Sequence, residues 1–256
     1  MFTRAIVRKP SKNFAEGITT AALGLPDYHL AMRQHDSYVR ALENCGLIVS
    51  VLEADADHPD STFVEDTAVI VGDLCVLARP GAASRAGEVA AIRSTIEAQI
   101  KKVVEIVAPG TLDGGDICEA GGHFFIGTSQ RTNEEGGRQL ARFLSEAGFS
   151  GSFVDIREMS NILHLKSGLA HLGDKDLVVW ESLAGLSPFQ GYNLIPVKDG
   201  EEYAANCVRV NDSVLVAAGF PDFAGVIARA GHNPLVLEMS EFQKMDGGLS
   251  CLSLRF

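Results

Sequence analysis

Five strand-like runs recur along the 256 residues, and each leads into a polar or Gly/Pro turn. The runs are 5–8, 75–79, 124–127, 177–180 and 214–217. Most are followed by a helical segment, clearest at 28–45, 86–101, 132–147 and 222–230, and then by a further β-rich run. A degenerate repeat of this kind constrains the fold more strongly than any single motif does.

A second strand is predicted beside each run, and we call these five the companion strands. They are 62–71, 111–120, 162–172, 204–211 and 249–256. Each carries polar residues that a plain core strand would lack, namely Glu65, Asp66, Asp113, Asp116, His164, Asn206 and Cys251. Five such units closed in a ring would direct these strand ends to one central cavity. The alternative for each residue is that it satisfies local backbone or caps a turn.

Local signals predict where the helices end. Thr132 and Glu135 have the spacing of a capping box before the third helix. Gly46, Gly148 and Gly231 stand where helices commonly stop. The stretch 182–203 fits the pattern of the repeat poorly. We therefore expect the fourth repeat to have lost most of its helix.

Composition excludes several classes of function. A formal charge of −11 disfavours nucleic acid as a partner and favours a cationic substrate. No run approaches the roughly 20 apolar residues of a membrane span, and residues 1–10 read as a strand and not as a signal peptide. We therefore expect a cytoplasmic protein without a membrane partner.

The cysteines and histidines give no sign of a metal site. Five widely spaced cysteines without a C-x-x-C pair argue against disulfides and thiolate zinc. The seven histidines lack ligand spacing, and neither a P-loop nor G-x-G-x-x-G is present. We expect no metal and no nucleotide cofactor. Cys45, Cys75, Cys118 and Cys207 are interpreted as packing residues.

Cys251 follows the Gly247-Gly248 turn on a short apolar strand, and it has two interpretations. It is either a small buried hydrophobe or a nucleophile whose glycines admit a ligand close to the backbone. With His164 as acid or base and Asp113 to orient the histidine, it forms a catalytic group. The neighbouring carboxylates should raise the pKa of the Cys251 thiol. A cationic substrate such as a guanidinium would then supply the positive charge that favours the thiolate.

Seven motifs in order carry a resemblance that covers essentially the whole chain. They are Phe63–Asp66, Arg79–Ala82 with Ser84-Arg85, Leu112–Asp116, Arg131–Asn133, Leu163–Ser167, Ala204–Cys207 and Asp246–Cys251. Together they resemble the dimethylarginine dimethylaminohydrolase family of the guanidino-group-modifying superfamily. The resemblance implies a five-bladed α/β propeller of ββαβ repeats with a central active-site cavity, and we predict a single catalytic domain over residues 1–256.

The resemblance also implies a reaction. Cys251 would attack the guanidinium carbon of an N-methylated arginine, and His164 would protonate the departing methylamine or dimethylamine. The same histidine would then activate water, releasing citrulline from a covalent thiouronium adduct. A homodimer is a further expectation from the family.

Roles at the substrate follow residue by residue from the same resemblance. Asp66 and Asp113 would face the guanidinium, with Glu65 assisting. Arg85 and Arg131 would bind the carboxylate. The α-amino group would be bound by Asp60 and by the backbone carbonyls near Ile18 and Met245, and the segment 11–27 would form a lid.

Two alternatives stay open at this point. An arginine or agmatine deiminase uses similar chemistry, although agmatine has no carboxylate for the two arginines, and discrimination of arginine by a methyl group is worth only about 1–3 kcal/mol. A non-catalytic binder of arginine derivatives would need the carboxylates but not both Cys251 and His164.

Overall fold

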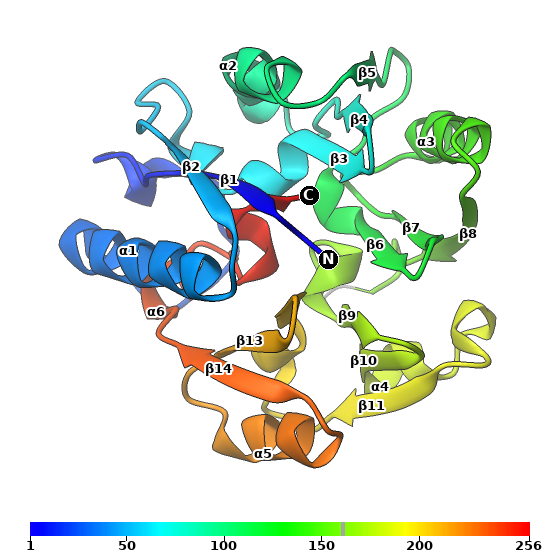
Figure 1. The fold of residues 1–256 in the computed structure, drawn as a ribbon. Helices are drawn as coiled ribbons and strands as arrows, with labels where there is room; N and C mark the ends of the chain where they lie inside the picture. Colours follow the sequence, from blue (N-terminus) through cyan, green and yellow to red (C-terminus); the bar gives the residue numbers. More distant parts are fainter. Residues whose placement is uncertain (160–161) are drawn as a thin grey trace. The chain divides into compact units, whose positions relative to one another are not determined.

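The computed structural model describes residues 1–159 and 162–256, and Figure 1 shows their helices and strands coloured along the sequence. These residues form two compact units. Residues 1–64 and 197–256 make up the first unit, and residues 65–196 make up the second. The single catalytic domain expected over residues 1–256 stays a prediction.

The described residues contain five three-stranded sheets, which is the number that the repeat predicts. The first unit holds the sheets β15 (Leu254–Arg255), β1 (Arg4–Arg8), β2 (Ile48–Leu52) and β12 (Val208–Val210), β13 (Ser213–Ala217), β14 (Asn233–Leu237). The second holds β3 (Ala68–Val71), β4 (Leu74–Leu77), β5 (Lys102–Glu105); β6 (Ile117–Ala120), β7 (His123–Thr128), β8 (Ser150–Asp155); and β9 (Leu169–Gly173), β10 (Asp176–Trp180), β11 (Asn193–Val197).

The central strands β1, β4, β7, β10 and β13 coincide with the five predicted runs. Each pairs antiparallel with a companion strand. In four sheets the central strand also pairs in parallel with the outer strand, and the connection between the two passes through a helix. Such a parallel crossover requires a long connection, which explains the helix in each repeat. Central strands are almost wholly buried, whereas β2 and β14 are largely half-exposed.

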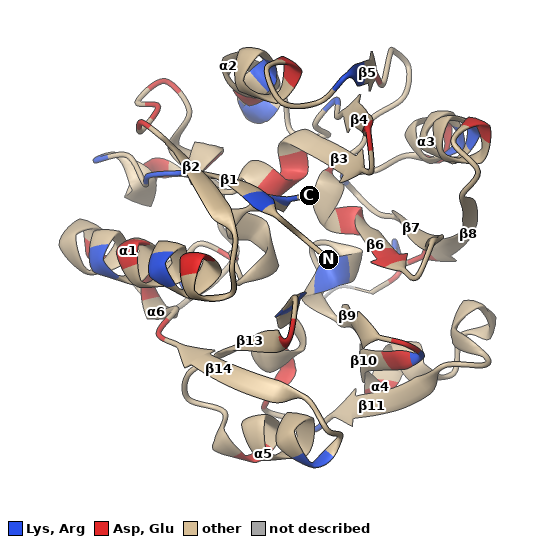
Figure 2. Cartoon of the chain, in the orientation of Figure 1, with Lys and Arg blue, Asp and Glu red and all other residues tan. Residues whose placement is uncertain are grey.

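The helices are α1 (Tyr28–Asn44), α2 (Ala86–Glu97), α3 (Glu134–Glu146), α4 (Glu181–Ala184), α5 (Pro221–Arg229) and α6 (Ser240–Gln243). Figure 2 shows charged residues of both signs along α1, α2 and α3. Gly46, Gly148 and Gly231 follow three of these helices with φ near +90°, as predicted. The four-residue α4 confirms that the fourth repeat has lost most of its helix. No helix in the two described stretches has the length and apolar character needed to cross a bilayer.

The N-cap prediction for α3 was wrong. Asn133, not Thr132, caps the helix, and its side chain accepts a hydrogen bond from the Gly136 N–H. The Thr132 hydroxyl instead accepts the Asp113 N–H at 3.0 Å. The side chain of Glu135 contacts Arg138 and Gln139 on the helix.

The companion strands are shorter than predicted, because each begins only after a 3-10 turn. These turns are Val64–Thr67, Gly114–Asp116, Leu165–Ser167, Glu202–Ala205 and Ser250–Leu252. We call them the entry turns. Cys251 therefore lies in an entry turn and not on a strand, which corrects the prediction.

Each unit has its own apolar core. In the first unit Phe14, Phe63 and Phe242 pack ring against ring at 5.6–6.4 Å between centroids, beside the buried Tyr38. The second unit has two apolar clusters, one of which includes β4 and β7 and the other β9 and β10. These cores anchor the strands whose entry turns carry the polar residues.

Candidate active site

The residues singled out in the sequence divide between the two units, and Glu65, Asp66, Asp116 and Cys251 lie in entry turns. The first unit holds Ile18, Asp60, Asn206, Met245 and Cys251. The second holds Glu65, Asp66, Arg85, Asp113, Asp116, Arg131 and His164.

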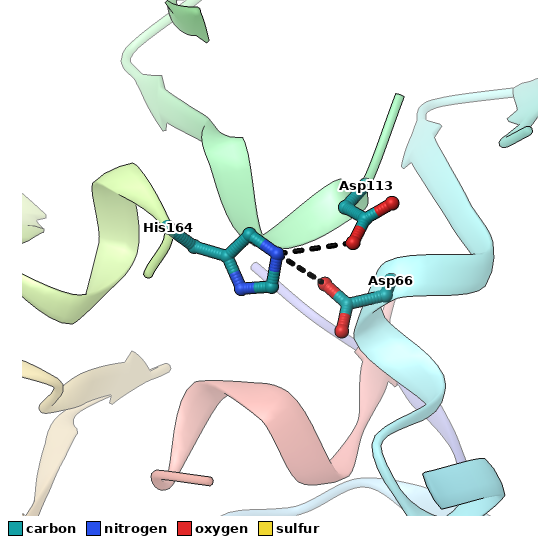
Figure 3. A group of neighbouring side chains, drawn as sticks. All are labelled: Asp66, Asp113 and His164. Carbon is teal, nitrogen blue, oxygen red and sulfur yellow. Dashed lines mark hydrogen bonds and ion pairs between the residues drawn. The ribbon is translucent and has the colours of Figure 1, made fainter. Parts of the chain in front are cut away.

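His164 is the centre of the group in the second unit. It precedes the turn Leu165–Ser167 and is only 6% exposed. Its Nε2 lies 3.1 Å from an Asp113 carboxylate oxygen and 4.0 Å from one of Asp66, so a single ring nitrogen faces both carboxylates (Figure 3). Burial lowers the pKa of His164, but the charges of Asp66 and Asp116 and the hydrogen bond to Asp113 outweigh it and raise the pKa to about 9. The ring is an imidazolium at neutral pH.

Backbone donors fix the two carboxylates beside His164. The Gly115 N–H donates to Asp66 Oδ1 and the Gly81 N–H donates to Asp113 Oδ1, each at 2.9 Å. Burial alone would raise the pKa of Asp66, but the charges of His164 and Arg85 outweigh burial and lower the pKa to about 2. Asp66 is therefore ionised throughout the neutral range.

Arg85 lies between two buried carboxylates. Its Nη1 donates to Asp66 Oδ2 at 2.5 Å, and Nε and Nη2 donate to the two oxygens of Glu88 at 2.9 and 2.7 Å. Sequence reasoning missed Glu88, although its position three residues after Arg85 at the start of α2 is a recognisable helical ion-pair spacing. A role for Arg85 at the substrate carboxylate stays a prediction.

Arg131 and Glu65 lie at the margins of this group. Arg131 Nη1 is 4.0 Å from Asp113 Oδ2, and its side chain is 14% exposed. Glu65 is buried and pairs at 2.7 Å with Lys166, which sequence reasoning also missed. Both interactions balance carboxylate charge around His164.

The second unit thus provides a compact site for a cation. One atom from each of Asp66, Asp113 and His164 lies within 4.8 Å of the others. The two carboxylates of this group suit a flat organic cation. Bidentate hydrogen bonding to carboxylates is the preferred mode for a guanidinium.

Cys251 lies in a turn of the first unit that other elements hold firmly. The Tyr38 hydroxyl donates to the Leu249 carbonyl and the Tyr203 hydroxyl to that of Gly247, both at 2.8 Å. The Gly248 N–H points to Cys251 Sγ at 3.4 Å.

The structure gives the Gly247-Gly248 pair a reason within the protein itself. A Cβ at Gly247 would lie 2.1 Å from the Phe63 ring, and one at Gly248 would lie 2.4 Å from Asn206 Oδ1. Glycine is needed here because protein side chains occupy the space. The interpretation of the pair as room for a ligand stays a prediction.

Ile18, Asp60 and Met245 come together in the first unit. The Ile18 N–H donates to both carboxylate oxygens of Asp60 at 3.1 Å. A Cβ on Gly17 would lie 2.3 Å from Asp60 Oδ1 and 3.2 Å from Met245 Cε. The buried Asp60 therefore holds the segment around Ile18 beside Met245.

The remaining cysteines pack as predicted. Cys75, Cys118 and Cys207 are buried, and Cys45 packs against the core of the first unit. Burial raises the pKa of Cys75 to about 12 and that of Cys118 to about 11. These two thiols stay protonated at neutral pH and are unreactive.

Comparison with known proteins gives relatives along the whole chain, although no family model matches it. The N(G),N(G)-dimethylarginine dimethylaminohydrolase of Pseudomonas aeruginosa is 42% identical over 257 residues and covers both chains completely. The protein of that name from Streptomyces coelicolor is 35% identical over 98% of this chain and 96% of its own.

Solved structures agree. A Cys-to-Ser variant of the Pseudomonas aeruginosa protein in complex with citrulline matches the whole chain with a TM-score of 0.97 at 42% identity. A His-to-Gly variant of a dimethylarginine dimethylaminohydrolase, as an adduct with S-methyl-L-thiocitrulline, gives a TM-score of 0.96 over both chains. The N-terminal domain of ArgZ, a cyanobacterial arginine dihydrolase, shares only the fold, at 18% identity and a TM-score of 0.87 over 98% of this chain and 97% of its own.

These similarities confirm the predicted fold class, the five-bladed α/β propeller of ββαβ repeats. Two full-length relatives above 30% identity carry the same name. The chain therefore belongs to the dimethylarginine dimethylaminohydrolase family.

Proposed function

We propose that the protein hydrolyses Nω-methylated arginines, asymmetric dimethylarginine and monomethylarginine, to citrulline and dimethylamine or methylamine. The observation that carries this proposal is the buried imidazolium of His164 held by Asp66 and Asp113. A group of that kind can both face a guanidinium and give a proton to a leaving amine. Relatives captured with citrulline and with a thiocitrulline adduct support the same chemistry.

In the proposed mechanism, the Cys251 sulfur forms a bond to the guanidinium carbon. His164 gives its proton to the methylated nitrogen, and the C–N bond breaks to release the amine. The neutral histidine then takes a proton from water, and the resulting hydroxide attacks the thiouronium carbon. Cleavage of the C–S bond releases citrulline and returns the thiolate.

The other site residues bind the substrate in this proposal. Asp66 and Asp113 face the guanidinium, and Glu65 supports them through its pair with Lys166. Arg131 and Arg85 balance the substrate carboxylate. Asp60 receives the α-ammonium group together with carbonyls near Ile18 and Met245, which is supported by the contact of Asp60 with the Ile18 N–H. A homodimer and a place in the cytoplasm belong to the same proposal.

The test compares dimethylarginine, monomethylarginine, arginine and agmatine as substrates, with citrulline and amine both quantified. We expect both methylated arginines to be preferred. Cys251→Ser should bind them but release no amine, whereas the matched Cys45→Ser should keep wild-type turnover. Arginine as the best substrate would favour a deiminase, and undiminished citrulline from Cys251→Ser would refute the assignment of the nucleophile.

A further inference from the structure

Asp116 is a fully buried carboxylate that the proposed reaction does not use. It belongs to the entry turn Gly114–Asp116 of the second unit, on the same turn as Asp113. Its Oδ1 accepts the backbone N–H of Leu165, the residue after His164, at 3.0 Å. Its Oδ2 accepts the Ser129 hydroxyl at 2.7 Å. Both oxygens are thus committed to segments that are distant in the sequence.

Ser129 extends this connection to Arg131. The Ser129 Oγ accepts the N–H of Arg131 at 2.9 Å and the N–H of Thr132 at 3.0 Å. The Thr132 hydroxyl in turn accepts the Asp113 N–H at 3.0 Å. Asp116 therefore ties together the segments that carry Asp113, Arg131 and His164.

A charged carboxylate that is fully buried, as Asp116 is, destabilises the folded protein unless its hydrogen bonds compensate. Burial raises the pKa of Asp116 to about 6, although His164 and the hydroxyl hydrogen bonds oppose that rise. Arg85 is already paired with Asp66 and Glu88, and Lys166 with Glu65. A neutral side chain of the same volume would destabilise the folded protein less, but it could not accept hydrogen bonds from both the Leu165 and the Ser129 segments.

We propose that Asp116 is a positioning residue with two separable arms, one that sets the ring of His164 through Leu165 and one that sets Arg131 through Ser129. This inference rests on the proposed function, in which His164 transfers the protons and Arg131 binds the substrate carboxylate. Because the arms end on residues with different tasks, they should affect different kinetic constants.

Asp116→Asn tests the arm to His164. Asparagine keeps the shape of the side chain but has only one acceptor oxygen. The Leu165 N–H and the Ser129 hydroxyl each need an acceptor, so the two segments cannot both stay in place. We expect kcat for dimethylarginine to fall on the order of tenfold to hundredfold. The alkaline limb of the pH–rate profile should also move to lower pH, because His164 loses one negative neighbour while Asp66 and Asp113 remain.

Ser129→Ala tests the arm to Arg131 and is the matched variant. It leaves the Leu165 contact in place and removes the acceptor that holds the Arg131 and Thr132 N–H groups. We expect KM for dimethylarginine to rise on the order of tenfold, with a smaller loss of kcat and a smaller shift of the pH profile than in Asp116→Asn, because the Leu165 arm to His164 stays in place. This variant also decides the question if Asp116→Asn does not fold, since an unchanged KM would then overturn the proposal.

A titration of the histidine side chains by NMR separates this inference from the proposed function. His164→Gln identifies the resonance, and Asp116→Asn should lower the pKa of His164 whether or not a substrate is known. If the wild type hydrolyses no methylarginine, the proposed function fails while the titration still reports on Asp116. If hydrolysis is normal but Asp116→Asn leaves kcat, the pH profile and the His164 titration unmoved, Asp116 only fills space and the inference is wrong.

Discussion

Gly115 allows His164 and Asp66 to approach each other. A Cβ built on this residue would lie 2.8 Å from the imidazole Cγ and Nδ1 and 2.8 Å from Asp66 Oδ1. Its N–H also donates to the same Asp66 oxygen. Glycine at position 115 is therefore required for the close approach of His164 and Asp66.

Gly115→Ala should separate the two side chains. We expect kcat to fall on the order of hundredfold, the effect of roughly 1 Å of misplacement. Gly185→Ala is the matched control, because nothing lies within 4 Å of its Cβ position. Steady-state kinetics of both variants with dimethylarginine test this, and equal activities would contradict it.

The charge on His164 should also appear in the stability of the protein. Its pKa is about 9 in the folded protein against 6.5 for an ordinary histidine, so its contribution is fully present below about pH 6.5 and is lost as pH rises through about 9. The gap corresponds to up to about 3 kcal/mol at about 1.4 kcal/mol per unit. Urea unfolding at pH 6.5 and pH 10 should show the wild type losing stability relative to His164→Gln. A difference that does not change with pH would contradict the ion-pair geometry.

Some residue roles could be predicted from the sequence and others could not. His164 and Asp113 were paired from residue type and order, and the structure brings them to 3.1 Å. The structural partners Glu88 and Ser129 were missed, because each acts through a contact made only in the folded unit. Residue types in the sequence indicate the candidate reacting groups. The residues that position those groups can be identified only from contacts in the folded structure.

Entry turns are the element that the sequence did not reveal. A 3-10 turn of three or four residues is too short to show a period, so its residues were assigned to the strand that follows. The polar residues nevertheless marked the turns, since Asp66, Asp113 and Cys251 all lie within one residue of one. The cap of α3 failed for a similar reason, because adjacent Thr132 and Asn133 are both good N-cap residues.

Asn206 should be the main clamp on the entry turn of Cys251. Its amide oxygen accepts the Ser250 N–H at 2.9 Å, and its Nδ2 donates to the Ser250 hydroxyl at 3.1 Å. Asn206→Ala leaves buried groups of Ser250 without this partner, which costs about 1–3 kcal/mol of stability. Turnover should fall with it, as the turn loses its fixed position.

Asn233→Ala provides the control for Asn206. Asn233 makes an exposed side-chain hydrogen bond to Ser213 at 3.2 Å in the same unit. Thermal unfolding and citrulline release should both be near wild type in this variant. Comparable losses in the two variants would show that Asn206 has no special role at the turn.

At the scale of the molecule, the repeat was enough to predict five units, each with a companion strand beside its central strand. Central strands buried on both faces gave continuous apolar runs, which are readable without knowledge of the partners. The pairing of residues between distant segments was not readable, because it depends on how entry turns from different repeats meet. The resemblance supplied the fold name, and the full-length relatives confirmed it.

The two ends of the chain share a sheet, since β15 pairs with β1 and the Phe256 carbonyl accepts the N–H groups of Thr3 and Arg4 at 2.9 and 2.8 Å. The backbone break in this sheet is thus bridged by hydrogen bonds alone. We expect a circular permutant, joined by a short linker between residues 256 and 1 and opened at the exposed Gly121-Gly122 turn, to fold and to release citrulline. Loss of folding on permutation would contradict this. The position at which the chain starts would then not determine the fold, because hydrogen bonds between β1 and β15 already join the two ends.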